Sequence, residues 1–144
     1  MKKLRSTQGF TLLEIIVVVA IIAILAAYIA PKVTGRVDDA RISKAKSDIR
    51  VLESSLELYK LDNFVYPSSD QGLEALVNKP SGSNMRNWRD GGYIKKLAKD
   101  PWGNEYRYVY PGSNGEFDVF SLGADAAVGG VDEAADIGNW NLDG

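Results

Sequence analysis

The longest hydrophobic stretch of the chain runs from Phe10 to Ala30 and is followed directly by Pro31. Glu14 is the only charged residue within these 21 positions. An α-helix rises about 1.5 Å per residue, so a helix of this length would span about 31 Å, roughly the thickness of the hydrocarbon core of a bilayer. The stretch therefore predicts a transmembrane helix, which Pro31 ends or kinks.

Basic residues precede this hydrophobic stretch. Lys2, Lys3 and Arg5 lie upstream of it, with no acidic residue among them. Because positively charged flanks stay on the cytoplasmic side of a membrane, we expect the N-terminus in the cytoplasm and the rest of the chain on the opposite side. The chain is thus predicted to cross the membrane once.

Beyond Pro31, apolar residues recur at spacings typical of one face of a helix. They are Val33, Val37, Ala40, Ile49, Leu52, Leu56 and Tyr59. The sequence Leu61-Asp-Asn and the nearby Pro67 are typical of a helix end. The pattern predicts either one helix from Phe10 to about Leu61 or two helices separated at Pro31.

The second half of the chain has the composition of loops and short strands. A short helix is predicted at 71–78, and strands are predicted at 105–110, 117–122 and 137–140. Trp88 and Tyr93, in the loop region between them, are predicted to be core side chains rather than a binding platform. We therefore expect an α+β fold, in which one very long N-terminal helix packs against a small C-terminal antiparallel sheet of about three strands.

The composition narrows the possible chemistry. The 144 residues include no His and no Cys, which excludes Ser-His-Asp and Cys-His catalysis and Cys- or His-based structural zinc. The formal net charge of −2 argues against nucleic acid as a partner. Without disulfides, the stability of a domain outside the cytoplasm must come from packing or from a bound ion.

Glu14 is unusual for a membrane helix, because a carboxylate near the bilayer centre costs about 2.5–3.5 kcal/mol. An ordinary anchor has no use for such a residue. A cleavable secretory signal needs small residues spaced as in A-x-A after the apolar run, and the alanines from Ala23 to Ala30 are not spaced that way. Glu14 therefore indicates a partner or a site.

The residues at this junction resemble a known signal. Gly9-Phe10-Thr-Leu-Leu-Glu14 after a short basic leader is similar to the class III signal of type IV pilins and pseudopilins. The resemblance implies that a prepilin peptidase cuts between Gly9 and Phe10 and methylates the new N-terminus at Phe10. A charge pair is far cheaper in a low-dielectric packing than a lone carboxylate, so Glu14 would pair with the Phe10 ammonium of a neighbouring subunit and set the register of assembly.

The resemblance extends through nearly the whole chain. The segments 59–63, 71–76, 100–103, 121–125 and 136–140 are together similar to the major pseudopilins of the bacterial type II secretion system. This implies a type IV pilin-like fold with a cleaved leader (1–9), a transmembrane and filament-core helix (10–31) and a periplasmic domain (32–144).

The same resemblance implies a structural protein and not an enzyme. The chain would be a single-pass protein of the bacterial inner membrane that forms a homopolymeric periplasmic filament for the export of folded proteins. Its partners would be other copies of itself, minor pseudopilins, the inner-membrane assembly platform and the prepilin peptidase.

One alternative is a type IV pilus major pilin, which usually ends in a disulfide-bounded loop that this chain cannot form. The other is a membrane-tethered enzyme, for which the sequence offers only carboxylates and hydroxyls.

A second signal is the acidic end of the chain, where no Lys or Arg follows Glu116. Asp125, Asp132, Glu133 and Asp136 fall in one loop rich in Gly and Ala, and we expect them to repel each other without nearby basic residues. Such a run is usually a solvated surface, and it lacks the EF-hand pattern. Carboxylates together with exposed carbonyls also suit a hard cation with oxygen ligands.

The resemblance implies that this loop binds Ca²⁺. The family's ligands correspond here to the carbonyl of Leu122 and the carboxylates of Asp125 and Asp136. The stretch 126–135 varies within the family, so Asp132 and the carbonyl of Val128 are further candidates without a fixed counterpart.

Overall fold

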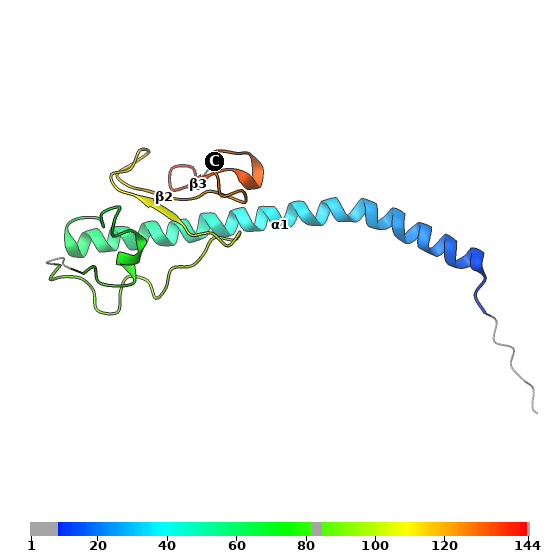
Figure 1. The fold of residues 1–144 in the computed structure, drawn as a ribbon, viewed down its shortest axis with the longest axis horizontal. Coiled ribbons are helices and arrows are strands. Elements are labelled where there is room, and N and C mark those ends of the chain that lie inside the picture. The colour runs from blue at the N-terminus through cyan, green and yellow to red at the C-terminus, as the bar shows by residue number, and fades with distance from the viewer. Residues whose placement is uncertain (1–8, 82–84, 144) are drawn as a thin grey trace, which may run out of the picture. The chain divides into compact units, whose positions relative to one another are not determined.

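The computed structural model describes residues 9–81 and 85–143, without the side chains of residues 30–34. Its elements are α1 (Leu12–Asn63), the 3₁₀ helix η1 (Leu73–Leu76), β1 (Arg107–Val109), β2 (Asp118–Ser121), the 3₁₀ helix η2 (Asp132–Ala134) and β3 (Ile137–Gly138) (Figure 1). The chain divides into two compact units, one ending at Val37 and the other beginning at Asp38.

The helix α1 contains 52 residues and continues through Pro31, so the alternative of two separate helices is wrong. Near its start, the backbone N–H of Glu14 donates to Thr11 Oγ1 at 3.2 Å. At its end, the N–H of Phe64 donates to the carbonyl of Lys60 at 2.7 Å, and Phe64 adopts a positive φ of 66°. A left-handed residue at this position is the common way to end a helix.

The first unit contains the apolar segment predicted to cross a membrane. Within it, the 18 residues Leu12–Ile29 are long and apolar enough for a membrane span, and none of them is buried by the rest of the chain. Exposed apolar surface on this scale needs lipid or other protein subunits to cover it. This supports anchoring of the chain in a membrane.

The second unit has its own hydrophobic core, built on one face of the C-terminal part of α1. Ile49, Leu56 and Tyr59 are fully buried there, together with Ala45 and Leu52. Val37 and Ala40 were predicted to belong to this face, but they are exposed. The prediction was wrong at these positions because helical spacing alone does not show where along a helix the domain begins to pack.

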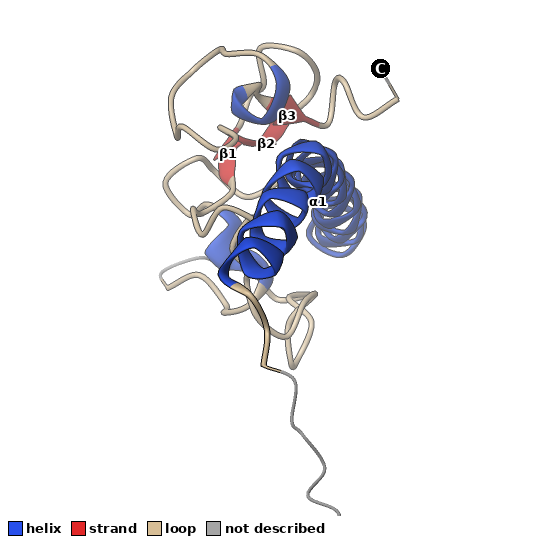
Figure 2. Ribbon diagram, turned by 90° about the vertical axis from the view of Figure 1, so that its right-hand side faces the viewer, coloured by secondary structure: helices blue, strands red, loops and turns tan. Residues whose placement is uncertain are grey.

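The strands form one antiparallel sheet in the order β1-β2-β3. Arg107 pairs with Phe120 and Val109 with Asp118 between β1 and β2, and Ser121 pairs with Ile137 between β2 and β3. Figure 2 shows this sheet beside α1, as the sequence predicted. Each strand and the short helix η1 are shorter than predicted. Glu105 forms an isolated bridge with Lys99 instead of extending β1, and residues on either side of η1 form turns.

Aromatic side chains of the connecting region complete this core. Trp88 Nε1 donates to the carbonyl of Ala75 at 3.0 Å, and the Trp88 and Tyr93 rings meet edge to face. The Tyr93 ring also lies 5.2 Å from that of Tyr59, centre to centre. Both residues pack against the core, which confirms their predicted role.

The burial of Tyr59 predicts a loss of stability in alkali. Burial and the nearby Tyr93 raise the pKa of Tyr59 to about 12, whereas an exposed tyrosine ionises near pH 10. The unfolded chain therefore releases its proton first, and the free energy of unfolding should fall as the pH rises from about 10 towards 12. We expect Tyr59→Phe to show a smaller fall, measured by urea unfolding across this pH range. An identical fall in wild type and variant would contradict the role of Tyr59.

Candidate functional site

The candidate site is the acidic loop, defined here as residues 122–136 between β2 and β3. It folds back on itself, because the N–H of Ala124 donates to the carbonyl of Glu133 at 2.8 Å. Gly123 makes this approach possible: its φ is 66°, and a Cβ there would lie 2.7 Å from the carbonyl oxygen of Glu133. In Figure 1 the loop is the orange segment that carries η2.

Asp136 is the residue of this loop whose environment most favours a cation. Its Oδ2 accepts a hydrogen bond from the N–H of Gly129 at 2.9 Å. Its Oδ1 is buried and has no hydrogen-bond donor among the described residues. A buried carboxylate oxygen without a donor is costly, so a bound cation would satisfy it.

The environments of the other predicted ligands point less clearly to a bound cation. Asp125 is exposed, and its Oδ1 accepts from the N–H of Ala127 at 3.0 Å. Asp132 begins η2 with a φ of 53° and is also exposed. Leu122 is half-buried directly after β2, and Val128 is 87% exposed. For both residues the candidate ligand is the backbone carbonyl, because their side chains carry no oxygen.

The loop does not bring three carboxylates together. Among the residues that the structure describes, no cluster of three acidic side chains could hold a metal ion by itself. A cation here would therefore need backbone carbonyls in addition to Asp136, which agrees with a ligand set that includes Leu122. Calcium accepts such mixed sets because it takes six to eight oxygen ligands in flexible geometry.

The expectation that no basic residue relieves the acidic loop was wrong. Glu133 Oε2 lies 3.9 Å from Arg41 Nη1 of α1. The two residues are far apart in the sequence, so only the folded domain places the Arg41 guanidinium beside the loop. The pair places a positive charge beside one of the two carboxylate oxygens of Glu133.

The predicted processing site lies at the beginning of the described chain. Gly9 and Phe10 precede α1 and are exposed, with Phe10 at 80%. Glu14 is exposed in the first turn of α1 and makes no ion pair within the described residues. The geometry leaves the Gly9–Phe10 bond and the Glu14 carboxylate accessible to other molecules.

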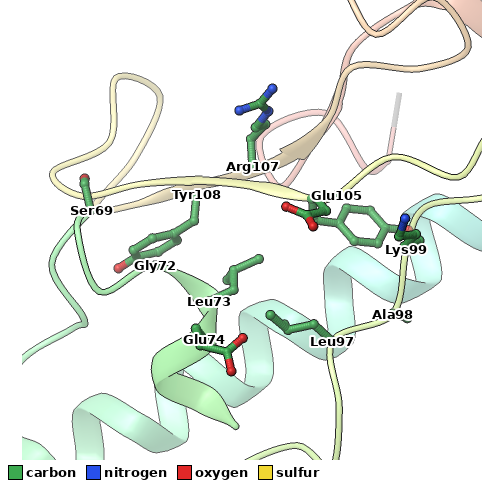
Figure 3. A pocket seen from close by; sticks show the side chains of 11 residues that line it. Ser69, Gly72, Leu73, Glu74, Leu97, Ala98, Lys99, Glu105, Arg107 and Tyr108 are labelled. Atoms are coloured by element: carbon green, nitrogen blue, oxygen red, sulfur yellow. The ribbon is translucent and has the colours of Figure 1, made fainter. Parts of the chain in front are cut away.

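A separate cleft of about 510 Å³ lies between η1, the segment 97–99 and β1 (Figure 3). Leu73, Leu97 and Tyr108 contribute apolar surface, and Lys99 and Glu105 bring opposite charges to its edge. None of the predicted site residues lines it. We assign it no function.

Two kinds of comparison identify the chain. The family described as type II secretion system protein G matches residues 32–140, and the prokaryotic N-terminal methylation motif matches residues 4–30. The chain belongs to the protein G family of the type II secretion system. A core protein G of this system from Vibrio cholerae is 57% identical over 142 residues, covering 99% of this chain and 97% of that protein. The core protein G of Pseudomonas aeruginosa is 56% identical, covering 95% of this chain and 97% of that protein.

The fold is confirmed by a solved relative. The crystal structure of the major pseudopilin from the type 2 secretion system of enterohaemorrhagic Escherichia coli aligns with a TM-score of 0.65 at 45% identity. The alignment covers 74% of this chain and 92% of that one. This confirms the predicted α+β pilin-like fold and the resemblance to major pseudopilins.

Family membership also decides between the alternatives. The chain is a major pseudopilin of the type II secretion system and not an enzyme. The readings as a type IV pilus major pilin and as a membrane-tethered enzyme were wrong.

Proposed function

We propose that this protein is the repeating subunit of a periplasmic pseudopilus that drives the export of folded proteins, and that calcium stabilises its domain. The observation that carries the filament proposal is the exposed apolar segment Leu12–Ile29, which lies within the region (residues 4–30) that matches the N-terminal methylation motif. In the membrane, lipid would cover this segment before assembly. In the filament, the same segments of neighbouring subunits would cover one another.

In this proposal the subunit is inserted once in the bacterial inner membrane, with its domain in the periplasm. It would polymerise with other copies of itself and meet minor pseudopilins and the inner-membrane assembly platform. The basic leader before Gly9 would hold the N-terminus in the cytoplasm, where the prepilin peptidase acts. Cleavage after Gly9 would leave Phe10 as the N-methylated first residue.

Cleavage explains why the apolar helix contains the carboxylate of Glu14. It creates an ammonium at Phe10, at the start of an apolar helix that must pack against other apolar helices. An unpaired charge in such packing is strongly unfavourable, whereas a Glu14 carboxylate from a neighbour would neutralise it. The exposed position of Glu14 supports pairing between subunits.

Calcium is the second part of the proposal. The buried Oδ1 of Asp136 supports it, since this oxygen has no donor among the described residues. Asp136, Asp125 and the carbonyl of Leu122 would hold the ion, with Asp132 and the carbonyl of Val128 as further ligands. The ion would supply positive charge that joins these parts of the acidic loop to one another.

The filament proposal is tested at the cleavage site. We expect Gly9→Ala to keep its leader and to form no filament, because even one added methyl group at the cut would not fit a peptidase site that accepts glycine there. Within the described structure, a Cβ at Gly9 would meet nothing within 4 Å, so the substitution should not disturb the folded chain. The leader is detected by N-terminal sequencing of membrane extracts from cells with and without a prepilin peptidase. Normal processing and secretion in this variant would overturn the proposed processing step.

A further inference from the structure

A buried carboxylate lies beside the start of the acidic loop. Asp100 is only 4% exposed, and its Oδ1 accepts hydrogen bonds from the N–H groups of Trp102 at 3.1 Å and Asn104 at 2.8 Å. Its Oδ2 accepts from Ser121 Oγ at 2.6 Å. Ser121 is the last residue of β2 and is fully buried. The carboxylate thus joins the turn 100–104 to the end of the strand that leads into the loop.

The Ser121 hydroxyl links Asp100 to the backbone of the acidic loop through two hydrogen bonds. It gives its only proton to Asp100, which leaves its lone pairs free to accept from the N–H of Gly123 at 3.1 Å. The side-chain amide of Asn104 adds a longer contact, 3.5 Å, to the carbonyl of Gly123. The hydrogen bond to the Gly123 N–H therefore depends on which way the Ser121 proton points, and Asp100 decides that.

The hydrogen bond to Gly123 also orients the carbonyl of Leu122. Both groups belong to one peptide unit, which is trans, because the cis bond of the described chain is Tyr110–Pro111. In a trans peptide the N–H and the C=O point to opposite sides. Holding the Gly123 N–H against Ser121 Oγ therefore turns the Leu122 carbonyl away from the hydroxyl and fixes its direction.

We propose that Asp100 and Ser121 are positioning residues for cation binding: through the Leu122–Gly123 peptide they hold the Leu122 carbonyl in the direction required of a ligand. This inference rests on the proposed binding of calcium by the acidic loop. It assigns a role to two residues that would not touch the ion. Partners that orient metal ligands typically change metal affinity by about 10- to 100-fold when they are removed.

The test uses the full-length chain in a non-ionic detergent and titration calorimetry with CaCl₂. Ser121→Ala removes the acceptor of the Gly123 N–H. Asp100→Asn keeps the shape of the side chain, but its NH₂ group would face Ser121 Oγ as a donor, since the backbone donors of Trp102 and Asn104 require its oxygen. We expect both variants to raise the Kd for calcium by about 10- to 100-fold.

Asp118→Asn is the matched control. Asp118 is also 4% exposed, and its carboxylate accepts from the N–H groups of Ser113 at 2.8 Å and Asn114 at 3.1 Å. It organises the loop between β1 and β2 and makes no hydrogen bond to the acidic loop among the described contacts. We expect Asp118→Asn to lower the melting temperature in chelator as the other two do, while its Kd for calcium stays at the wild-type value.

Melting in chelator also shows whether each variant is folded. Tryptophan fluorescence reports on the domain alone, because all three tryptophans, Trp88, Trp102 and Trp140, lie after Asp38. A wild-type Kd in folded Ser121→Ala and Asp100→Asn would overturn the positioning role and leave the calcium proposal standing. An equal rise of Kd in Asp118→Asn would overturn it too, because the effect would then follow general stability. Absence of calcium binding by the wild type would overturn the calcium proposal and this inference together.

Discussion

Calcium is expected to raise the melting temperature of the domain by about 10 °C, and Asp136→Ala is expected to remove that rise. A ligand that binds only the folded state stabilises it by about 2.7 kcal/mol at a hundredfold excess over its Kd. For a domain of this size, that corresponds to about 10 °C. Alanine at position 136 removes the buried Oδ1 that has no donor among the described residues, which is the strongest sign of a cation in the loop.

The measurement is thermal unfolding of the full chain in calcium, in magnesium and in chelator. Magnesium should stabilise less, because it keeps its waters and requires a stricter octahedral geometry. Asp125→Ala should behave as Asp136→Ala does. Asp143→Ala is the control: the Asp143 side chain is 95% exposed and pairs with Arg50 outside the loop, so its loss should leave the calcium effect intact. No saturable heat of binding and no change of melting on chelation would return the loop to a plain solvated surface.

Glu14→Leu is expected to be cleaved normally and to lose filament assembly almost completely. The Phe10 ammonium would then enter the apolar packing without a counter-charge. Removing one partner of a buried ion pair costs about 3–5 kcal/mol, which is more than a hundredfold in an association constant. Unlike Gly9→Ala, this variant keeps the bond that the peptidase cuts, so processing and assembly are separated.

Filaments sheared from cells and quantified by immunoblot measure this prediction, with N-terminal sequencing as the check on cleavage. Glu14→Asp is the conservative comparison, because it keeps the charge on a shorter side chain and should recover part of the yield. Wild-type filament yield from Glu14→Leu would remove the pairing proposal. Failure of cleavage in Glu14→Leu would instead place Glu14 in recognition by the peptidase and contradict its proposed role in assembly alone.

The sequence by itself determined the parts of this protein that depend on neighbouring residues. The apolar run after Gly9 and the helical spacing from Ile49 to Tyr59 are local patterns, and both were read correctly. The basic leader lies outside the described residues, and the role given to it stays a prediction. The three strands and their antiparallel hairpin were also predictable from composition. Their ends were not, because the length of a strand depends on its partner and on the turns that flank it.

Only the tertiary structure decided which distant groups meet. Arg41 lies beside Glu133, and the carboxylate of Asp100 holds the Ser121 hydroxyl, although neither pair shares a local pattern. The exposure of Val37 and the burial of Asp136 Oδ1 likewise depend on where the domain packs on α1 and how the acidic loop closes. Composition marks a carboxylate as a possible ligand. Whether one of its oxygens is left without a hydrogen-bond donor depends on groups from other segments, which come together only when the chain folds.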